Sequence, residues 1–280
     1  MNKELFIKTE IEKTNNDNVL TLLKLINENK RVIFTKFGDG EYFNMTSYLI
    51  QKDKMTSPYF ENCDKDKFTY DFGILLRKAF IDLCKRSTKD NIFLGRWHNN
   101  DVNIYLLELL FENSDKYNLV SPPFVNYHYI YPDYEYHKNN NLFNFVKTIQ
   151  NINNFKLIIS NKNNNRLNII FKGNYYLEIP ENSWFAMGLY NQIKDFISKV
   201  LNDFNNAFII LAAGMGSKIL INELSSLYHN ASFLDIGSGF DILASKKDTR
   251  NWNQGNSSKN NYTLYENQVN YFKELLPEDF

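Results

Sequence analysis

The stretch Arg31-Val-Ile-Phe-Thr-Lys-Phe-Gly-Asp-Gly-Glu41 joins an apolar run to a turn that contains two glycines and two acids. The run over 32–37 predicts a strand buried in a sheet. Glycines in the turn allow backbone conformations that residues with a Cβ avoid. Asp39 and Glu41 repel each other unless a cation, a basic side chain or a proton lies between them. Because hard divalent ions prefer such oxygens, we expect a metal or ligand loop at the mouth of a sheet. The competing interpretation is a simple turn that places Glu41 in the first turn of the next helix, where its charge suits the helix dipole.

Predicted strands and helices alternate along the rest of the chain, which is typical of an α/β fold. Several strands are apolar on both faces, as strands of a covered parallel sheet are. The predicted strands cover 32–37, 91–95, 117–120, 156–160, 166–171, 175–179, 207–213 and 231–236. The predicted helices cover 19–26, 66–86, 101–110, 142–149, 184–201, the segment after Gly216 and the end of the chain from Leu264. The segments 166–171 and 175–179 are compatible with a hairpin hinged at Gly173-Asn174.

Length and pattern favour one α/β domain over residues 1–280, with a mostly parallel sheet flanked by helices. We expect its core to cover about 18–245, followed by a tail and a C-terminal helix over 246–280. The tyrosine-rich segment 124–137 is expected to form an ordered loop, which either lines a ligand or, as we favour, packs only as part of the structure.

Composition excludes several classes of function. Lys plus Arg and Asp plus Glu each number 32, so nucleic-acid binding lacks the basic excess that supports it. No run approaches the roughly 20 apolar residues of a membrane span, which argues against an integral membrane segment. The first residues lack the apolar core of a signal peptide, and we expect a cytoplasmic protein.

Three further loops follow predicted strands, at the edge of the sheet where α/β proteins bind ligands. Gly214-Met-Gly-Ser-Lys218 follows an apolar strand and opens a helix, so its backbone amides can attract phosphate. Ser217 would add a hydroxyl and Lys218 a charge, although small residues here also suit tight strand-to-helix packing. Arg96, after another strand, can hold a diphosphate or lie in an ordinary surface loop.

The late segment Leu234-Asp-Ile-Gly-Ser-Gly-Phe-Asp241 looks like the glycine-rich first motif of an S-adenosylmethionine-dependent methyltransferase. That motif normally opens its fold, and here only about 40 residues remain, too few for the rest of such a domain. We therefore interpret Asp235 and Asp241 as site carboxylates, one of which acts as a base or binds a sugar hydroxyl. For Asp241 a helix N-cap is the competing interpretation.

Taken together, these segments resemble the GT-D-type glycosyltransferases. Phe37-Gly-Asp-Gly-Glu41 after a strand resembles the Arg-Phe/Tyr-Gly-Asp-Gly-Glu signature of that family, with its Asp-x-Glu metal motif. The segments 211–220 and 234–241 resemble its strand-Gly-small-helix and Asp-Ile-Gly segments, in the same order. Lys36 departs from the usual Arg, and Ser238 stands where some relatives have His.

This resemblance implies a Rossmann-like fold and sugar transfer from a nucleotide-sugar donor, with a uridine diphosphate sugar as the first expectation. Asp39 and Glu41 would bind Mn²⁺ or Mg²⁺ and the donor diphosphate, and the acceptor would be a hydroxyl of a glycan or glycoprotein. The predicted donor site comprises Lys36, Gly38, Asp39, Gly40, Arg96, Gly214, Gly216, Ser217 and Lys218. The methyltransferase and a non-catalytic carbohydrate-binding relative remain the alternatives.

Overall fold

The structure, a computed structural model, describes only part of the chain. The described residues are 16–38, 40–42, 44–45, 59–61, 67–87, 89–96, 123–126, 130, 141–180, 188–245 and 257–280. Asp39, the predicted helix over 101–110, the predicted strand over 117–120 and most of the tyrosine-rich loop lie outside them. None of the helices in the described ranges is both long and apolar enough to cross a membrane.

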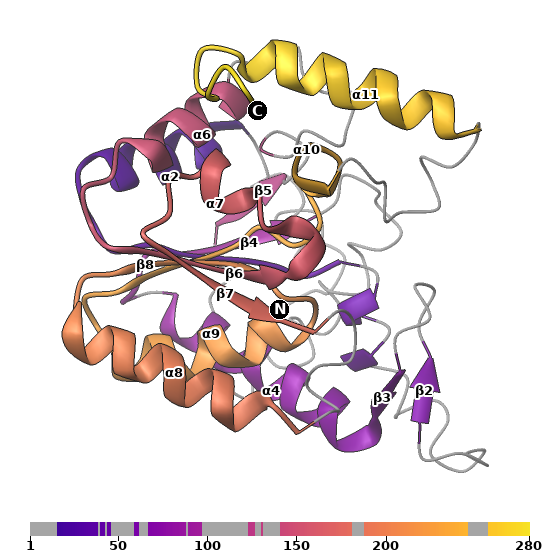
Figure 1. Cartoon of the computed structure of the whole chain (residues 1–280). Helices are drawn as coiled ribbons and strands as arrows, with labels where there is room; N and C mark the ends of the chain where they lie inside the picture. Colours follow the sequence, from indigo (N-terminus) through magenta and orange to yellow (C-terminus); the bar gives the residue numbers. More distant parts are fainter. Residues whose placement is uncertain are drawn as a thin grey trace.

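A seven-stranded parallel sheet runs through the middle of the molecule (Figure 1). Its strands are β1 (Ile33–Lys36), β4 (Ile92–Arg96), β5 (Phe124–Asn126), β6 (Lys156–Asn161), β7 (Tyr175–Ile179), β8 (Phe208–Ala212) and β9 (Ser232–Asp235). They lie in the order β5-β4-β1-β9-β8-β6-β7, and each neighbouring pair is parallel. A separate antiparallel pair consists of β2 (Tyr59–Glu61) and β3 (Lys67–Thr69). The predicted α/β fold class with a mostly parallel sheet is confirmed.

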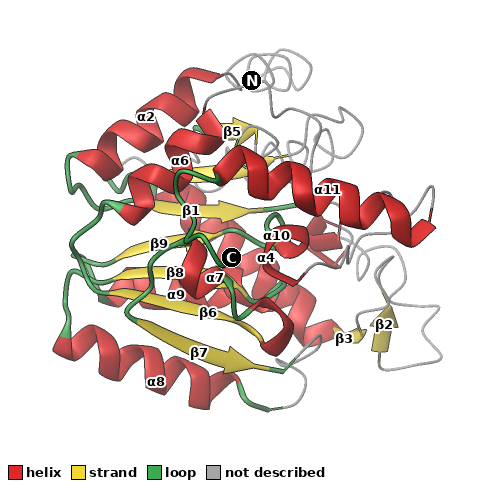
Figure 2. Ribbon diagram, turned by 45° about the horizontal axis from the view of Figure 1, so that its top comes forward, coloured by secondary structure: helices red, strands yellow, loops and turns green. Residues whose placement is uncertain are grey.

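Helices cover both faces of this sheet (Figures 1 and 2). One face carries α4 (Tyr70–Arg86), α8 (Tyr190–Asp203) and α9 (Gly216–Leu227). The other face carries α2 (Asn16–Asn27), α6 (Asn141–Gln150), α7 (Leu167–Ile170), α10 (Asp241–Ser245) and α11 (Ser257–Phe272), with the short 3₁₀ helix η2 (Lys162–Asn164) nearby. The chain therefore folds as helix, sheet and helix layers.

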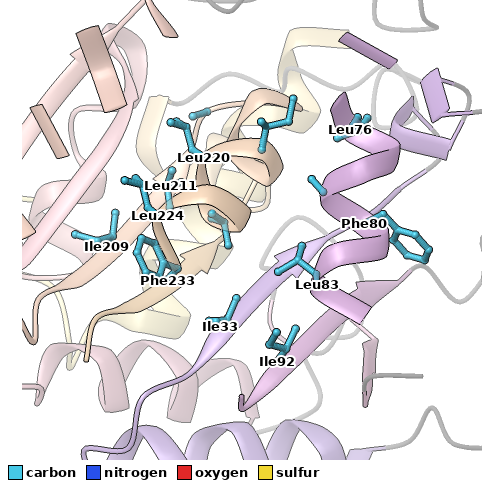
Figure 3. Packing of buried hydrophobic residues seen from close by; sticks show 14 of the residues in the cluster. Ile33, Leu76, Phe80, Leu83, Ile92, Ile209, Leu211, Leu220, Leu224 and Phe233 are labelled. Carbon is cyan, nitrogen blue, oxygen red and sulfur yellow. The ribbon is translucent and has the colours of Figure 1, made fainter. Parts of the chain in front are cut away.

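Two apolar cores separate these layers because the strands are apolar on both faces. Ile33 belongs to the core under α4 and α9, whereas its neighbour Phe34 points to the opposite core, as the alternation of side chains along a strand requires. In α4, Leu76, Phe80 and Leu83 recur at helical spacing and belong to this core together with residues of α9. In Figure 3 Leu83 points toward Ile33 and Ile92, whereas the Phe80 ring lies on the side of α4 away from α9. Burial on both faces explains the continuous apolar runs in the sequence.

The C-terminal helix is part of the same packing. Phe272, at the end of α11, is fully buried in the core under α2 and α6, and Leu276 lies beside it. This helix begins at Ser257, earlier than the Leu264 expected from its apolar residues. The sequence before Leu264 is polar, so apolar periodicity gave no signal for its first turns.

Three other predictions about secondary structure were wrong. The segment 124–137, expected to be a loop, begins with β5, which pairs with β4 in parallel. Residues 166–171 form α7 and its flanks, because Leu167 and Ile170 are buried at the three-residue spacing of a helix. No hairpin follows, since β7 pairs with β6 in parallel. The predicted helix over 66–86 is preceded by β3, and its Thr69 accepts a hydrogen bond from the Phe72 amide as the N-cap of α4.

Candidate functional site

The chain leaves β1 and β9, which are neighbours in the sheet, toward opposite faces. Phe37 and Met45, after β1, belong to the core under α4, whereas Ile236 and Phe240, after β9, belong to the other core. Ligands of open α/β sheets bind at such a switch point, beyond the carboxyl ends of the strands. The carboxyl ends of β1 and β9 are therefore the place where a site is expected.

A buried cluster of three charged side chains lies at this point. Nζ of Lys218, in the first turn of α9, is 2.8 Å from Oε1 of Glu41 and 2.8 Å from Oδ2 of Asp235. The side chain of Lys218 is 2 % exposed and that of Asp235 is 0 % exposed. One ammonium between two carboxylates leaves the cluster with a net formal charge of −1. The members come from the segment after β1, the first turn of α9 and the end of β9, which are distant in sequence.

Asp235, the last residue of β9, is surrounded by hydrogen-bond donors. Its Oδ2 also accepts from the Lys36 amide at 3.3 Å and the Thr35 hydroxyl at 3.4 Å, while its Oδ1 accepts from the Gly237 amide at 3.1 Å. A fully buried carboxylate needs such partners to remain charged. This environment suits a structural anion more than a base, because an incoming hydroxyl has no exposed face to approach.

Glu41 lies in the helical turn that follows Gly38. Its Oε2 accepts from the Gly38 amide at 2.9 Å, and its side chain is 10 % exposed. Burial by itself raises the pKa of the Glu41 carboxyl. The charges of Lys218 and Lys36, together with hydrogen bonds from Lys218 and Gly38, outweigh burial and lower this pKa to about 2. Glu41 is therefore an anion at any ordinary pH.

The glycines of this turn do not act in the way that the sequence suggested. Gly38 does not have a positive φ, and Gly40 is helical. A Cβ at Gly38 would lie 3.3 Å from Oε2 of Glu41 and 3.3 Å from Cε of Lys36. The absence of a side chain at Gly38 thus makes room for the carboxylate to reach the amide.

Lys218 was predicted to contact donor phosphate. An ammonium has three N–H hydrogens, and that of Lys218 already faces Glu41, Asp235 and, at 3.3 Å, the Gly214 carbonyl oxygen. Burial lowers the pKa of Lys218, but the two carboxylates more than offset burial and raise it above its ordinary value. The phosphate contact stays a prediction, and this geometry does not favour it because no hydrogen remains for a phosphate oxygen.

The start of α9 is shaped by Gly214. Its φ of +63° lies in the left-handed region that favours glycine, and the Gly214 carbonyl accepts from the Ser217 hydroxyl at 2.7 Å. The amides of Ser217 and Lys218 bond to the carbonyls of Gly214 and Met215. A phosphate contact at this helix N-terminus would therefore fall to amides before Ser217, such as that of Gly216.

Asp241 lies at the start of α10, on the opposite face of the sheet from α9 and Lys218 (Figure 1). Its Oδ1 accepts from Nδ2 of Asn164 at 2.8 Å, and its side chain is buried. Asn164 belongs to η2, so this bond joins α10 to the loop after β6. The two predicted catalytic carboxylates thus have different surroundings, and only Asp235 is bonded to the lysine.

The remaining predicted residues are placed only in part. The backbone of Arg96 ends β4, beside the end of β1, but its side chain is outside the described set, and so is Asp39. Within the described ranges, no group of three histidine, cysteine or carboxylate side chains could hold a metal ion. The metal site and the donor contacts stay predictions.

Sequence reasoning missed the roles of Thr35 and Gly237 as donors to Asp235. Thr35 carried a usable signal: it is a hydroxyl residue in the middle of a strand predicted to be buried, and buried hydroxyls need partners. No sequence signal pointed to Gly237, because the direction of its backbone amide is set by the shape of the loop.

A scan against models of protein families and a search of curated proteins find no match to this sequence. Solved structures do match. A structure of the domain of unknown function 1792, described as having a distinct glycosyltransferase fold, superposes with a TM-score of 0.53 at 16 % sequence identity, covering 84 % of this chain and 82 % of that one. A selenomethionine form of that domain gives 0.53 at 17 % identity, with the same coverage.

A third structure, described as a new glycosyltransferase of this domain type from Streptococcus sanguinis, has a TM-score of 0.51 at 17 % identity and covers 78 % of this chain and 79 % of that one. At such low identity the likeness establishes the fold alone. The protein thus has an α/β fold that matches a glycosyltransferase fold, with a charged cluster at the switch point of its sheet.

Proposed function

We propose that this protein transfers a sugar from a nucleotide-sugar donor, in the first instance a uridine diphosphate sugar, to a hydroxyl of a glycan or glycoprotein. The observation that carries the proposal is the position of Glu41. It follows β1 at the switch point of a sheet whose fold matches structures described as glycosyltransferases.

A divalent cation, Mn²⁺ or Mg²⁺, is part of the proposal, with Asp39 and Glu41 as its protein ligands. The chemistry of the donor set fits, because Mg²⁺ is commonly bound through one or two carboxylates and substrate phosphates. Each oxygen of Glu41 has one described partner, and a carboxylate oxygen can accept a second. When bound, the cation would neutralise charge on the departing diphosphate.

The chain's own residues would hold the donor and move a proton. The N-terminus of α9 and the basic side chains of Lys36 and Arg96 would face the diphosphate. A carboxylate would take the proton of the acceptor hydroxyl, whose oxygen then bonds to the sugar carbon as the bond from that carbon to the diphosphate breaks. Of the two candidates we favour Asp241, because the donors around Asp235 occupy its carboxylate.

The methyltransferase alternative rests on Asp235-Ile-Gly-Ser-Gly239. Two observations weigh against it: β9 is the last strand of the sheet along the described chain, and the Asp235 carboxylate already binds Lys218. A carbohydrate-binding protein without catalysis is the other alternative.

Thermal unfolding with a panel of uridine, guanosine and cytidine nucleotide sugars, each with and without Mn²⁺, tests the proposal. We expect the midpoint to rise for one uridine diphosphate sugar and to rise further when Mn²⁺ is present, since a ligand that binds only the native state stabilises it. Stabilisation by S-adenosylmethionine alone would favour the methyltransferase. No response to any of these ligands would contradict the proposal.

A further inference from the structure

We propose that Lys218 is a positioning residue, whose ammonium ties the loops after β1, β8 and β9 together and holds Glu41 and Asp235 in place for sugar transfer. The statement about transfer rests on the proposed function, whereas the statement about the three loops does not. In this role Lys218 touches neither donor nor acceptor.

The first argument is the connection between the loops. Glu41 follows β1, Lys218 follows β8 and Asp235 ends β9, so the two contacts of 2.8 Å join three separate segments at one nitrogen. The carboxylates in turn accept hydrogen bonds from the backbone amides of Gly38, Lys36 and Gly237. The backbone at the carboxyl ends of β1 and β9 is thereby coupled to one side chain.

The second argument is the charge balance. The two carboxylate oxygens bound by Lys218 are no further apart than twice 2.8 Å, since both lie at that distance from one nitrogen. Two buried anions so close to each other repel. Without the ammonium, at least one carboxylate would have to move away, and the backbone that binds it at Gly38, Lys36 or Gly237 would move with it.

The third argument separates this role from that of a donor ligand. The Lys218 side chain is 2 % exposed, and its hydrogens face two carboxylates and the Gly214 carbonyl. A residue that only binds donor phosphate would present an unoccupied hydrogen to the donor. The buried position of Lys218 in the first turn of α9 therefore fits a positioning role better than contact with the donor.

Kinetics of three variants test the proposal. Lys218→Met removes the charge, and Lys218→Arg keeps the charge but replaces the compact ammonium by a planar fork. Lys194→Met is the matched control, because Lys194 also lies 2.8 Å from a carboxylate, that of Glu223, but at the surface. We expect both Lys218 variants to lower kcat, by about 100-fold for Lys218→Met, and the donor KM to rise by a smaller factor because Glu41 is displaced. The control should keep the kcat of the wild-type protein.

A rise in donor KM with kcat retained would mean that Lys218 contacts the donor, and it would overturn the proposal. Unchanged kinetics in either Lys218 variant would overturn it as well. If Lys218→Met does not fold, Lys218→Arg decides the matter, because it leaves no carboxylate without a counter-charge.

Hydrogen exchange gives a readout that does not depend on activity. We expect the amides of Lys36, Gly38 and Gly237 to exchange faster in the Lys218 variants than in the wild-type protein. The Ile33 amide, bonded to the Asn91 carbonyl at the other end of the sheet, should be unaffected. Unchanged exchange at the first three amides would overturn the proposal. If the wild-type protein transfers no sugar from any donor, the proposed function fails, and exchange alone then decides whether Lys218 holds the loops.

Discussion

Lys218 and Asp235 form an ion pair with 2.8 Å between Nζ and Oδ2, and neither side chain is more than 2 % exposed. Burying two charges is costly unless they are paired and hydrogen-bonded. Here the pair is extended by Glu41 and by backbone amides. The electrostatics of the candidate site are therefore built into the fold and do not depend on a ligand.

Asp235→Asn should destabilise the protein strongly. The substitution removes one carboxylate from Lys218 and places an amide where donors already converge, and breaking a buried pair typically costs about 3–5 kcal/mol. Chemical denaturation measures this loss. A loss under about 1 kcal/mol, the size of one ordinary hydrogen bond, would show that the pair is not buried as described.

Asp241→Asn, in contrast, should reduce activity strongly and stability only slightly. The Asn164 amide can still donate to the side-chain oxygen that the substitution retains, so we expect a loss of stability of only about 1 kcal/mol. If Asp241 takes the acceptor proton, kcat should fall by roughly 100-fold or more, as measured by transfer to an acceptor. Wild-type turnover in this variant would remove Asp241 as the base.

Glu41 should make stability depend on acid pH in the metal-free protein. Its pKa falls from 4.5 to about 2 on folding, so between these values the unfolded state binds more protons than the native state. The stabilisation is fully present above pH 4.5 and is lost as the pH falls toward 2. A shift of this size corresponds to roughly 3 kcal/mol.

The check is the difference in unfolding free energy between the wild-type protein and Glu41→Gln from about pH 6 down to about pH 2. That difference should shrink as the pH falls through the range below 4.5. A constant difference would contradict the lowered pKa.

Gly214 offers a test of backbone strain without steric contact. A Cβ added there meets no atom within 4 Å, but φ is +63°. Gly214→Ala should therefore cost about 1–2 kcal/mol through strain alone. Gly214→Asn should cost less, because Asn tolerates the left-handed region. Equal losses in the two variants would point to a cause other than φ.

The amino ends of the strands provide a control that is remote from the candidate site. Asp90 binds Arg31 at 2.8 Å and Arg86 at 3.3 Å, before β4 and β1 begin. Asp90→Asn leaves two arginines without this counter-charge and should cost about 2 kcal/mol. At temperatures below the unfolding midpoint of the variant, its kcat should equal that of the wild-type protein. A large fall in kcat would mean that the two ends of the sheet are coupled.

The layered fold could be predicted because its signals are local and repeated. Ile33 and Phe34 are both apolar and face opposite cores. Burial of both faces distinguishes a covered parallel strand from a strand with one face exposed to solvent. In α4 the spacing of Leu76, Phe80 and Leu83 gave the face toward the sheet. Periodicity failed at Leu167 and Ile170, where a short helix and a strand fit the same few apolar residues.

The charged cluster could be predicted only in its parts. Glu41 and Asp235 were singled out by their positions after strands, but nothing local in the sequence pairs them with Lys218. A signal did exist: Lys218 stands between buried residues in α9, and a lysine on a buried helix face needs an anion. The identity of that anion depends on β1 and β9 being neighbours, which is a property of the strand order.

The most direct test of the account is release of nucleoside diphosphate from a panel of nucleotide sugars, compared between the wild-type protein and the double variant Asp39→Asn, Glu41→Gln. Both proteins are assayed below their unfolding midpoints, with and without Mn²⁺, and Asp90→Asn serves as the control for reduced stability. We predict Mn²⁺-dependent release from one donor by the wild-type protein and by Asp90→Asn, and none by the double variant. Equal release by the double variant, or no release from any donor by the wild-type protein, would contradict the account.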